Sequence, residues 1–141
     1  QGDFLTSGGM GTMGYSIPAA MGAKYACKDK QVVAVCGDGS FQMSMYELGT
    51  LAVNKIPLKI LVMKNRYLGL VREYQHYNYQ DRYSGVRLHD YPYYDKIAEA
   101  YDMKYFEASD NESMPGIIDK FLSCEGSAIM VCNIDSQDIT K

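Results

Sequence analysis

The sequence predicts an α/β fold, a doubly wound and mainly parallel sheet flanked by helices. A continuous apolar run at 32–36 and two mainly apolar runs at 58–63 and 128–134 have the length and composition of buried strands. Segments with apolar residues at helical spacing lie between these runs. Because strands that alternate with helices form parallel βαβ units, residues 1–141 are interpreted as one domain, expected to be part of a longer chain.

The first half of the chain predicts two helices and a buried strand. Ser16 is expected to cap a helix that runs to about Cys27, with a proline tolerated in its first turn. The strand 32–36 follows and ends at Gly37. A second helix is indicated by the helical spacing of Met45, Leu48, Leu51 and Ala52.

The second half repeats this alternation after a polar insertion. Strand 58–63 leads into a tyrosine-rich stretch, 65–91, which is predicted to be a long loop over the carboxyl edge of the sheet. A helix over 94–101 and a short strand over 104–107 come next. Ser113 is expected to cap the last helix, whose apolar residues are Met114, Ile117, Ile118, Phe121 and Leu122.

Charge and composition exclude some partners and indicate a compartment. A formal net charge of -3 offers no basic surface for nucleic acid or an anionic membrane. No apolar run approaches the ~20 residues that span a bilayer. The sequence contains no C-x-x-C pair, and Cys27, Cys36, Cys124 and Cys132 are interpreted as reduced core cysteines. These observations favour a reducing, cytoplasmic location.

Two strand ends carry the chemistry. Asp38 lies between Gly37 and Gly39, directly after one buried strand, and Asn65 follows the next. The backbone N–H groups of Gly39 and Ser40 would face a phosphate at a helix N-terminus. A carboxylate, an amide oxygen and a diphosphate make the oxygen shell that Mg²⁺ prefers. The pattern predicts a metal–diphosphate site, with a simple turn or cap residue at Asp38 as the alternative.

A glycine cluster at 8–14 supports a competing interpretation. It contains a literal G-x-G-x-x-G from Gly9, and Asp38 falls where an acid could bind a ribose hydroxyl. An NAD-binding Rossmann oxidoreductase domain is therefore an alternative. Against it, residues 3–7 make a poor buried strand. A non-catalytic, flavodoxin-like interaction domain is a further alternative, since fold alone does not determine function.

Residues 37–39 read Gly-Asp-Gly, and Asn65 follows the next predicted strand, with Lys64 before it. Together they resemble the GDG…NN signature in the C-terminal domain of the thiamine-diphosphate enzymes, with Lys64 in place of the first asparagine. Segments 4–15 and 68–72 (LGLVR) extend the resemblance to the acetolactate synthase large catalytic subunit. Residues 82–84 and 96–100 resemble later segments of that subunit.

The resemblance implies roles for individual residues. Asp38, Asn65 and the backbone carbonyl of Tyr67 would hold Mg²⁺. Met13 would wedge beneath thiamine diphosphate and bend it into a V, which brings its pyrimidine amine close to the thiazolium C2. The reactive carbon chemistry would then belong to the cofactor. The remaining residues implied to contact the cofactor are Gly11, Gly39, Ser40, Leu68, Gly69 and Leu70.

The resemblance also implies a reaction. It implies a carboligase, a transferase of branched-chain amino acid biosynthesis, which decarboxylates pyruvate and joins the two-carbon unit to a second 2-oxoacid. Tyr74 would line the pocket for that second substrate, where the family usually has tryptophan. Both Tyr74 and Lys64 leave the identity of the acceptor open.

The resemblance places other parts of the enzyme outside this chain. The activating glutamate would lie on a missing pyrimidine-binding domain and FAD in a missing middle domain, so no catalytic residue is expected here and the isolated chain should be inactive. A homo-oligomer, such as a dimer, and a regulatory subunit are the implied partners. The alternative is one subunit of a two-chain thiamine-diphosphate-dependent 2-oxoacid decarboxylase.

Overall fold

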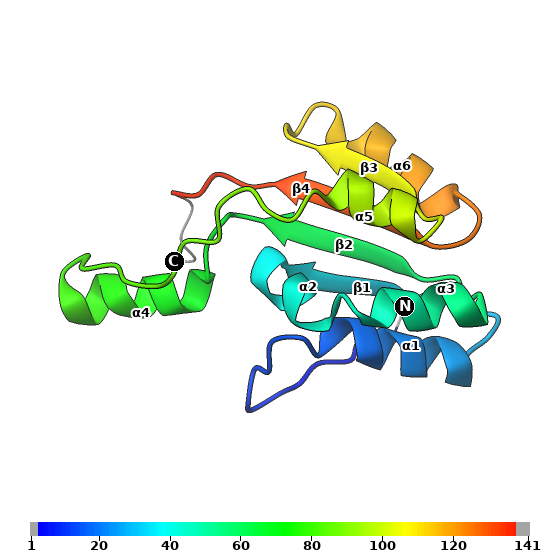
Figure 1. Ribbon diagram of the computed structural model, residues 1–141, viewed down its shortest axis with the longest axis horizontal. Coiled ribbons are helices and arrows are strands. Elements are labelled where there is room, and N and C mark those ends of the chain that lie inside the picture. Colours follow the sequence, from blue (N-terminus) through cyan, green and yellow to red (C-terminus); the bar gives the residue numbers. More distant parts are fainter. Residues whose placement is uncertain (1–2, 138–141) are drawn as a thin grey trace.

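A computed structural model describes residues 3–137 and contains a four-stranded parallel sheet (Figure 1). The strands lie in the order β1-β2-β4-β3, and all neighbouring pairs are parallel. Their bounds are Val33–Gly37 (β1), Lys59–Lys64 (β2), Lys104–Ala108 (β3) and Ala128–Asn133 (β4). The predicted α/β class with a parallel sheet is confirmed.

Helices cover both faces of the sheet. One core packs α1, α2, α3 and α5 against one face, and a second core packs α6 against the other face of β3 and β4. None of the helices between residues 3 and 137 is long and apolar enough to cross a membrane. The helices are Ser16–Ala26 (α1), Asp38–Ser44 (α2), Glu47–Asn54 (α3), Gly69–Tyr79 (α4), Tyr94–Ala100 (α5) and Met114–Ser123 (α6).

The strand register brings the carboxyl ends of the strands to one edge. Gly37 pairs with Met63, and Lys64 pairs with Asn133. The segments that leave β1 and β2 therefore begin side by side, as expected for Asp38 and Asn65.

Several predicted boundaries and environments are wrong. Ser16 is the first residue of α1 rather than its cap, and Tyr15 precedes it without a side-chain capping bond. The helix indicated by Met45, Leu48, Leu51 and Ala52 is α3, which begins at Glu47, and a separate short helix, α2, occupies Asp38–Ser44 before it. Cys27 is exposed, so it is not a core cysteine, although Cys36 and Cys132 are buried.

The stretch 65–91 is not all loop, because it contains α4. This helix projects from the body of the molecule (Figure 1), and Arg72 is its one buried residue. The Arg72 guanidinium donates to the backbone carbonyl of Ser136 and stacks 4.4 Å from the ring of Tyr67. Leu70, Val71, Tyr74 and Tyr77 do recur at helical spacing along α4, but all four are exposed, so this stretch has no buried face and was interpreted as a loop.

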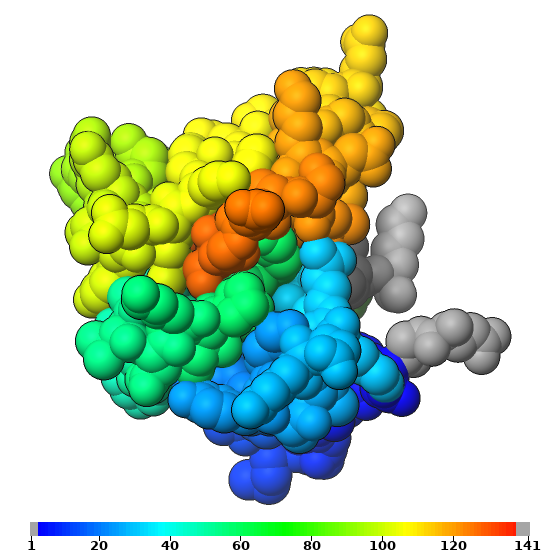
Figure 2. All heavy atoms as spheres, turned by 90° about the vertical axis from the view of Figure 1, so that its right-hand side faces the viewer, coloured from blue at the N-terminus to red at the C-terminus, as the bar shows by residue number. Residues whose placement is uncertain are grey.

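A buried lysine lies at the edge of the sheet where the strands begin, opposite to the edge that carries Asp38. This edge faces the viewer in Figure 2. Lys59, at the start of β2, is 5% exposed. Its ammonium donates to the carbonyls of Cys124 and Gly126, both at 2.7 Å, and contacts the Cys124 sulfur at 3.1 Å. These contacts satisfy the charge and fasten the turn between α6 and β4 to the central strand.

Lys59→Met is expected to destabilise the domain, because it removes the buried ammonium that donates to the carbonyls of Cys124 and Gly126. Hydrogen bonds from charged groups are strong, so the free energy of unfolding should fall by about 2–4 kcal/mol in urea denaturation. Lys96→Met is the matched control, since Lys96 forms an exposed pair with Glu99 and should change the value by less than about 0.5 kcal/mol. Equal effects of the two substitutions would contradict the structural role of Lys59.

Candidate functional site

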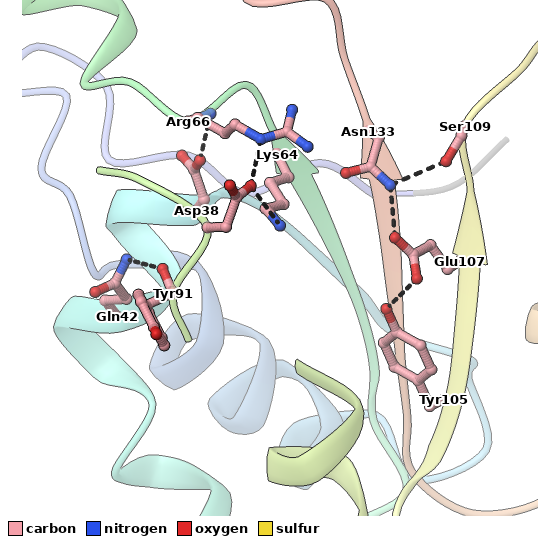
Figure 3. A network of polar contacts seen from close by, with 10 residues as sticks. Asp38, Gln42, Lys64, Arg66, Tyr91, Tyr105, Glu107, Ser109 and Asn133 are labelled. Atoms are coloured by element: carbon pink, nitrogen blue, oxygen red, sulfur yellow. Dashed lines mark hydrogen bonds and ion pairs between the residues drawn. The ribbon is translucent and has the colours of Figure 1, made fainter. Parts of the chain in front are cut away.

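Asp38 joins the ends of β1 and β2. It is the first residue of α2 and only 3% exposed. One carboxylate oxygen accepts the Gly39 backbone N–H at 3.0 Å, and the other accepts the Arg66 backbone N–H at 2.7 Å (Figure 3). A single buried side chain therefore connects two adjacent strand ends at the edge where ligands bind in such sheets.

Burial dominates the electrostatics around Asp38. It raises the pKa of the Asp38 carboxyl, against the smaller lowering by the Arg66 and Gly39 N–H groups and by the charge of Lys64. Burial, with Asp38 adding to it, raises the pKa of Cys36 to about 12, so this thiol stays neutral. The ionised Asp38 lacks full compensation within the protein, which is the condition of a carboxylate that binds a cation.

A strained turn after β2 completes this edge. Arg66 adopts a left-handed conformation with φ of 65°, rare for a side chain of this size, and this conformation accompanies the bond from its N–H to Asp38. Asn65 uses its side-chain oxygen to accept the Tyr67 backbone N–H at 3.0 Å. The amide oxygen of Asn65 is thus fixed in the same turn whose next residue, Arg66, donates to the Asp38 carboxylate.

The later part of the 65–91 stretch lies over the same edge, as predicted. Leu68 donates its N–H to the Val86 carbonyl, and Leu88 donates to the Arg66 carbonyl, both at 2.8 Å. Tyr67 and Arg87 form the antiparallel bridge between these bonds. The segment around residue 88 is thereby held close to the turn that contacts Asp38.

Gly39 lies at the base of an apolar cradle. A Cβ atom at this position would lie 2.7 Å from Leu68 Cδ2, 3.0 Å from Met13 Cε and 3.1 Å from Leu88 Cδ1. The three neighbours are ends of flexible side chains that come from three separate segments. The absence of a side chain at Gly39 therefore lets Leu68, Met13 and Leu88 pack directly against the backbone at the start of α2.

The glycine-rich segment is attached to α2. Ser40 accepts the Gly14 backbone N–H on its hydroxyl at 2.8 Å. Gly14 has a φ of 81°, and a Cβ there would lie 3.2 Å from Met43 Cβ, so this position requires glycine. This attachment places Met13 against Gly39.

The structure brings most of the predicted residues together. Met13 and Leu68 contact Gly39 in the cradle. The residues on either side of Gly39 are also engaged, since Asp38 accepts the Arg66 N–H and Ser40 accepts the Gly14 N–H. Gly69 also belongs here, since a Cβ on it would lie 3.2 Å from Asn65 Nδ2. Gly11, Leu70 and Tyr74 are exposed, and the ring contact recorded for Tyr74 is with Tyr79 on α4.

The sequence pattern did not indicate four residues of this site. Arg66 contributes a backbone group, which no residue pattern reveals, and its side chain donates to Asp90 at 2.6 Å. Leu88 and Asp90 lie in a stretch with no periodicity. Tyr94 was predicted only as a helix residue, yet its ring lies beneath Lys64.

At the neighbouring strands β3 and β4, Figure 3 shows a second polar network through Tyr105, Glu107, Ser109 and Asn133.

These residues fit a magnesium–diphosphate group. The site offers one buried carboxylate, one fixed amide oxygen and a glycine-based cradle at a strand end. No group of three or more His, Cys, Asp or Glu side chains that could hold a metal ion occurs within residues 3–137. Mg²⁺ commonly binds through one or two protein oxygens together with phosphate oxygens, so this donor set is the expected one.

The fold and site define a cofactor-binding domain of the thiamine pyrophosphate (thiamine diphosphate) enzymes. The family model described as "Thiamine pyrophosphate enzyme, C-terminal TPP binding domain" matches residues 1–132, and the chain belongs to this family. The match agrees with the resemblance of its motifs. The Rossmann alternative is wrong, because residues 3–7 form no strand before the glycine-rich segment.

Within the family, the chain is similar to acetolactate synthases. It is 38% identical over 136 residues to the acetolactate synthase large subunit of Porphyra purpurea, covering 96% of this chain and 23% of that protein. It is 38% identical over 133 residues to acetolactate synthase isozyme 2 large subunit of Escherichia coli, covering 94% and 24%. The chain thus spans about a quarter of the length of these curated relatives.

The raised pKa of Asp38 predicts how metal-free stability changes with pH. The folded state binds this proton more tightly than the unfolded state, so this carboxyl's contribution is most favourable below its unfolded pKa, near 3.8, and is lost as pH rises through the folded value. The gain in unfolding free energy from Asp38→Asn should therefore increase with pH in urea denaturation from about pH 4 to 8 with a chelator present.

Asp90→Asn provides a control of opposite sign. Arg66 lowers the pKa of the Asp90 carboxyl, so its contribution is present above the unfolded pKa and is lost as pH falls. The difference between Asp90→Asn and the natural sequence should therefore change with pH in the opposite direction, and only below about pH 5, so the titration extends to about pH 3. Parallel pH dependences for the two variants would contradict the account of Asp38.

Gly39→Ala is expected to separate binding from folding. The added methyl group fills the cradle, but its neighbours are flexible, so the unfolding free energy should change by less than about 1 kcal/mol. Calorimetry should show thiamine diphosphate binding weakened at least about tenfold. Gly22→Ala, which meets no atom within 4 Å, is the control and should bind as the natural sequence does. Unchanged binding in Gly39→Ala would show that the cofactor does not approach here.

Proposed function

We propose that this chain is the thiamine-diphosphate- and magnesium-binding domain of an acetolactate synthase-like carboligase. The enzyme decarboxylates pyruvate and joins the two-carbon unit to a second 2-oxoacid. The observation that carries the proposal is the buried Asp38 carboxylate at the strand edge, beside the turn of Asn65 and the cradle of Gly39. The names of the relatives support the reaction class.

The chain's own residues bind and orient the cofactor. Asp38, Asn65 and the Tyr67 carbonyl would hold Mg²⁺. The N–H group of Ser40 would contact the diphosphate, and that of Gly39 would do so in exchange for its bond to Asp38. The Ser40 hydroxyl is engaged with Gly14, so its backbone N–H is the group left for the ligand. When bound, thiamine diphosphate supplies the carbanion chemistry of 2-oxoacid decarboxylation.

Met13 positions the organic part of the cofactor in this proposal. Its thioether methyl lies against Gly39, at the base of the cradle. A flexible apolar side chain at this place would pack against the organic rings of the bound cofactor. Gly11, Leu70 and Tyr74 lie on exposed segments, and we propose that they contact cofactor or acceptor substrate when the rest of the enzyme encloses the site.

The proton acceptor of the reaction is proposed to lie outside this chain. Burial raises the pKa of Cys36 and Tyr94 beside Asp38, so both stay protonated at neutral pH. Asp38 itself is assigned to the metal. A glutamate from the pyrimidine-binding domain would then provide the base.

An apolar part of the sheet supports the existence of a partner surface. Val33 and Val35, on the face of β1 that points away from the core, are 39% and 53% exposed, and Met63 on β2 is 37% exposed. Such side chains on a central sheet face are normally covered. We propose that another part of the enzyme or a second copy of the chain packs here, while FAD and a regulatory subunit belong to the longer protein.

Complementation tests this function. The chain alone is expected to release no CO₂ from pyruvate with Mg²⁺ and thiamine diphosphate present. Addition of the upstream part of an acetolactate synthase large subunit should restore acetolactate formation, and the same mixture with Asp38→Ala should stay inactive. Turnover by the chain alone would contradict the missing base. Decarboxylation without ligation would instead favour the two-chain decarboxylase.

A further inference from the structure

Lys64 places a nearly buried ammonium group at the cofactor edge. It is the last residue of β2, and its side chain is 12% exposed. Side chains alternate along a strand, so Lys64 shares the face of Ile60 and Val62 and lies over the Tyr94 ring, with Nζ 5.7 Å from its centroid. The ammonium group thus lies one residue before Asn65, on the side of the sheet that carries Asp38.

The Lys64 ammonium group is only loosely paired, and its charge also acts on the Asp38 carboxyl. Its carboxylate partner is Asp90, at 3.7 Å, and Asp90 is 71% exposed and already accepts the Arg66 Nε–H at 2.6 Å. The Lys64 and Arg66 side chains thus share one carboxylate oxygen of Asp90, and the dashed lines of Figure 3 show both contacts. Lys59, at the other end of the same strand, has three close acceptors instead. A cation that is buried but loosely paired is available to an incoming anion.

A fixed positive charge at this edge has opposite effects on the two parts of the ligand. It attracts a diphosphate and repels a divalent cation that arrives without one. Arg66 does not share this role to the same degree, because its side chain is engaged with Asp90. The charge at Lys64 therefore favours the metal and the diphosphate together over the metal alone.

We propose that Lys64 is a second cation of the diphosphate site, which strengthens diphosphate binding and weakens binding of a metal ion alone. This inference rests on the proposed function and assigns Lys64 a positioning role, selecting the metal–diphosphate complex over free metal. The ligand class is the diphosphate group, so inorganic diphosphate and Mn²⁺ serve as separate probes.

Two binding measurements on Lys64→Met test the proposal. Calorimetry with inorganic diphosphate, without metal, should show affinity reduced about fivefold to tenfold, as expected for loss of one partly buried charge. Electron paramagnetic resonance of Mn²⁺, without diphosphate, should show affinity increased by a similar factor. Lys96→Met removes an equal but exposed charge and should change neither constant by more than about twofold.

The opposite signs distinguish this role from a structural one. A substitution that only loosened the site would weaken both probes, and that result, or no change in either, would overturn the inference. Lys64→Arg should keep both constants near those of the natural sequence, and Lys64→Gln repeats the test should Lys64→Met fail to fold by circular dichroism. If the natural chain bound neither probe, the proposed function itself would be contradicted.

Discussion

The contact between the Asp38 carboxylate and the Arg66 backbone N–H is the interaction on which the rest of the site depends. It links the ends of two adjacent parallel strands at 2.7 Å, in a place that is almost free of water. It accompanies a left-handed backbone conformation at Arg66. In the same turn, the Asn65 side-chain oxygen accepts the Tyr67 backbone N–H. Burial of the carboxylate costs folding free energy, and a bound cation would recover that cost.

The two ends of β2 show how one strand separates stability from function. At its amino end, Lys59 is surrounded by acceptors and fastens the α6–β4 turn. At its carboxyl end, Lys64 is nearly as buried but loosely paired, beside a carboxylate whose charge is also incompletely satisfied. The loosely paired Lys64 and the buried Asp38 thus both lie at the edge proposed to bind the ligand. Groups that are costly for folding are expected at functional sites.

The fold was predictable where local pattern and tertiary role coincide. The strands at 32–36, 58–63 and 128–134 carry the apolar runs of buried strands, and parallel topology then places Asp38 beside the Asn65 turn. α4 was missed because its apolar residues, Leu70, Val71, Tyr74 and Tyr77, lie among polar ones and are exposed, while Arg72 is its buried residue. Arg66 acts through its backbone, and Leu88 reaches Gly39 only through tertiary contact, so neither leaves a sequence signal.

The central claim is that the Asp38 edge binds thiamine diphosphate through a metal ion. Calorimetric titration of thiamine diphosphate into this chain, with and without Mg²⁺, tests it most directly, with Asp38→Ala as the control. The account predicts binding that requires the metal and disappears in Asp38→Ala. Binding of equal strength without Mg²⁺, or binding that survives the loss of the Asp38 carboxylate, would contradict it.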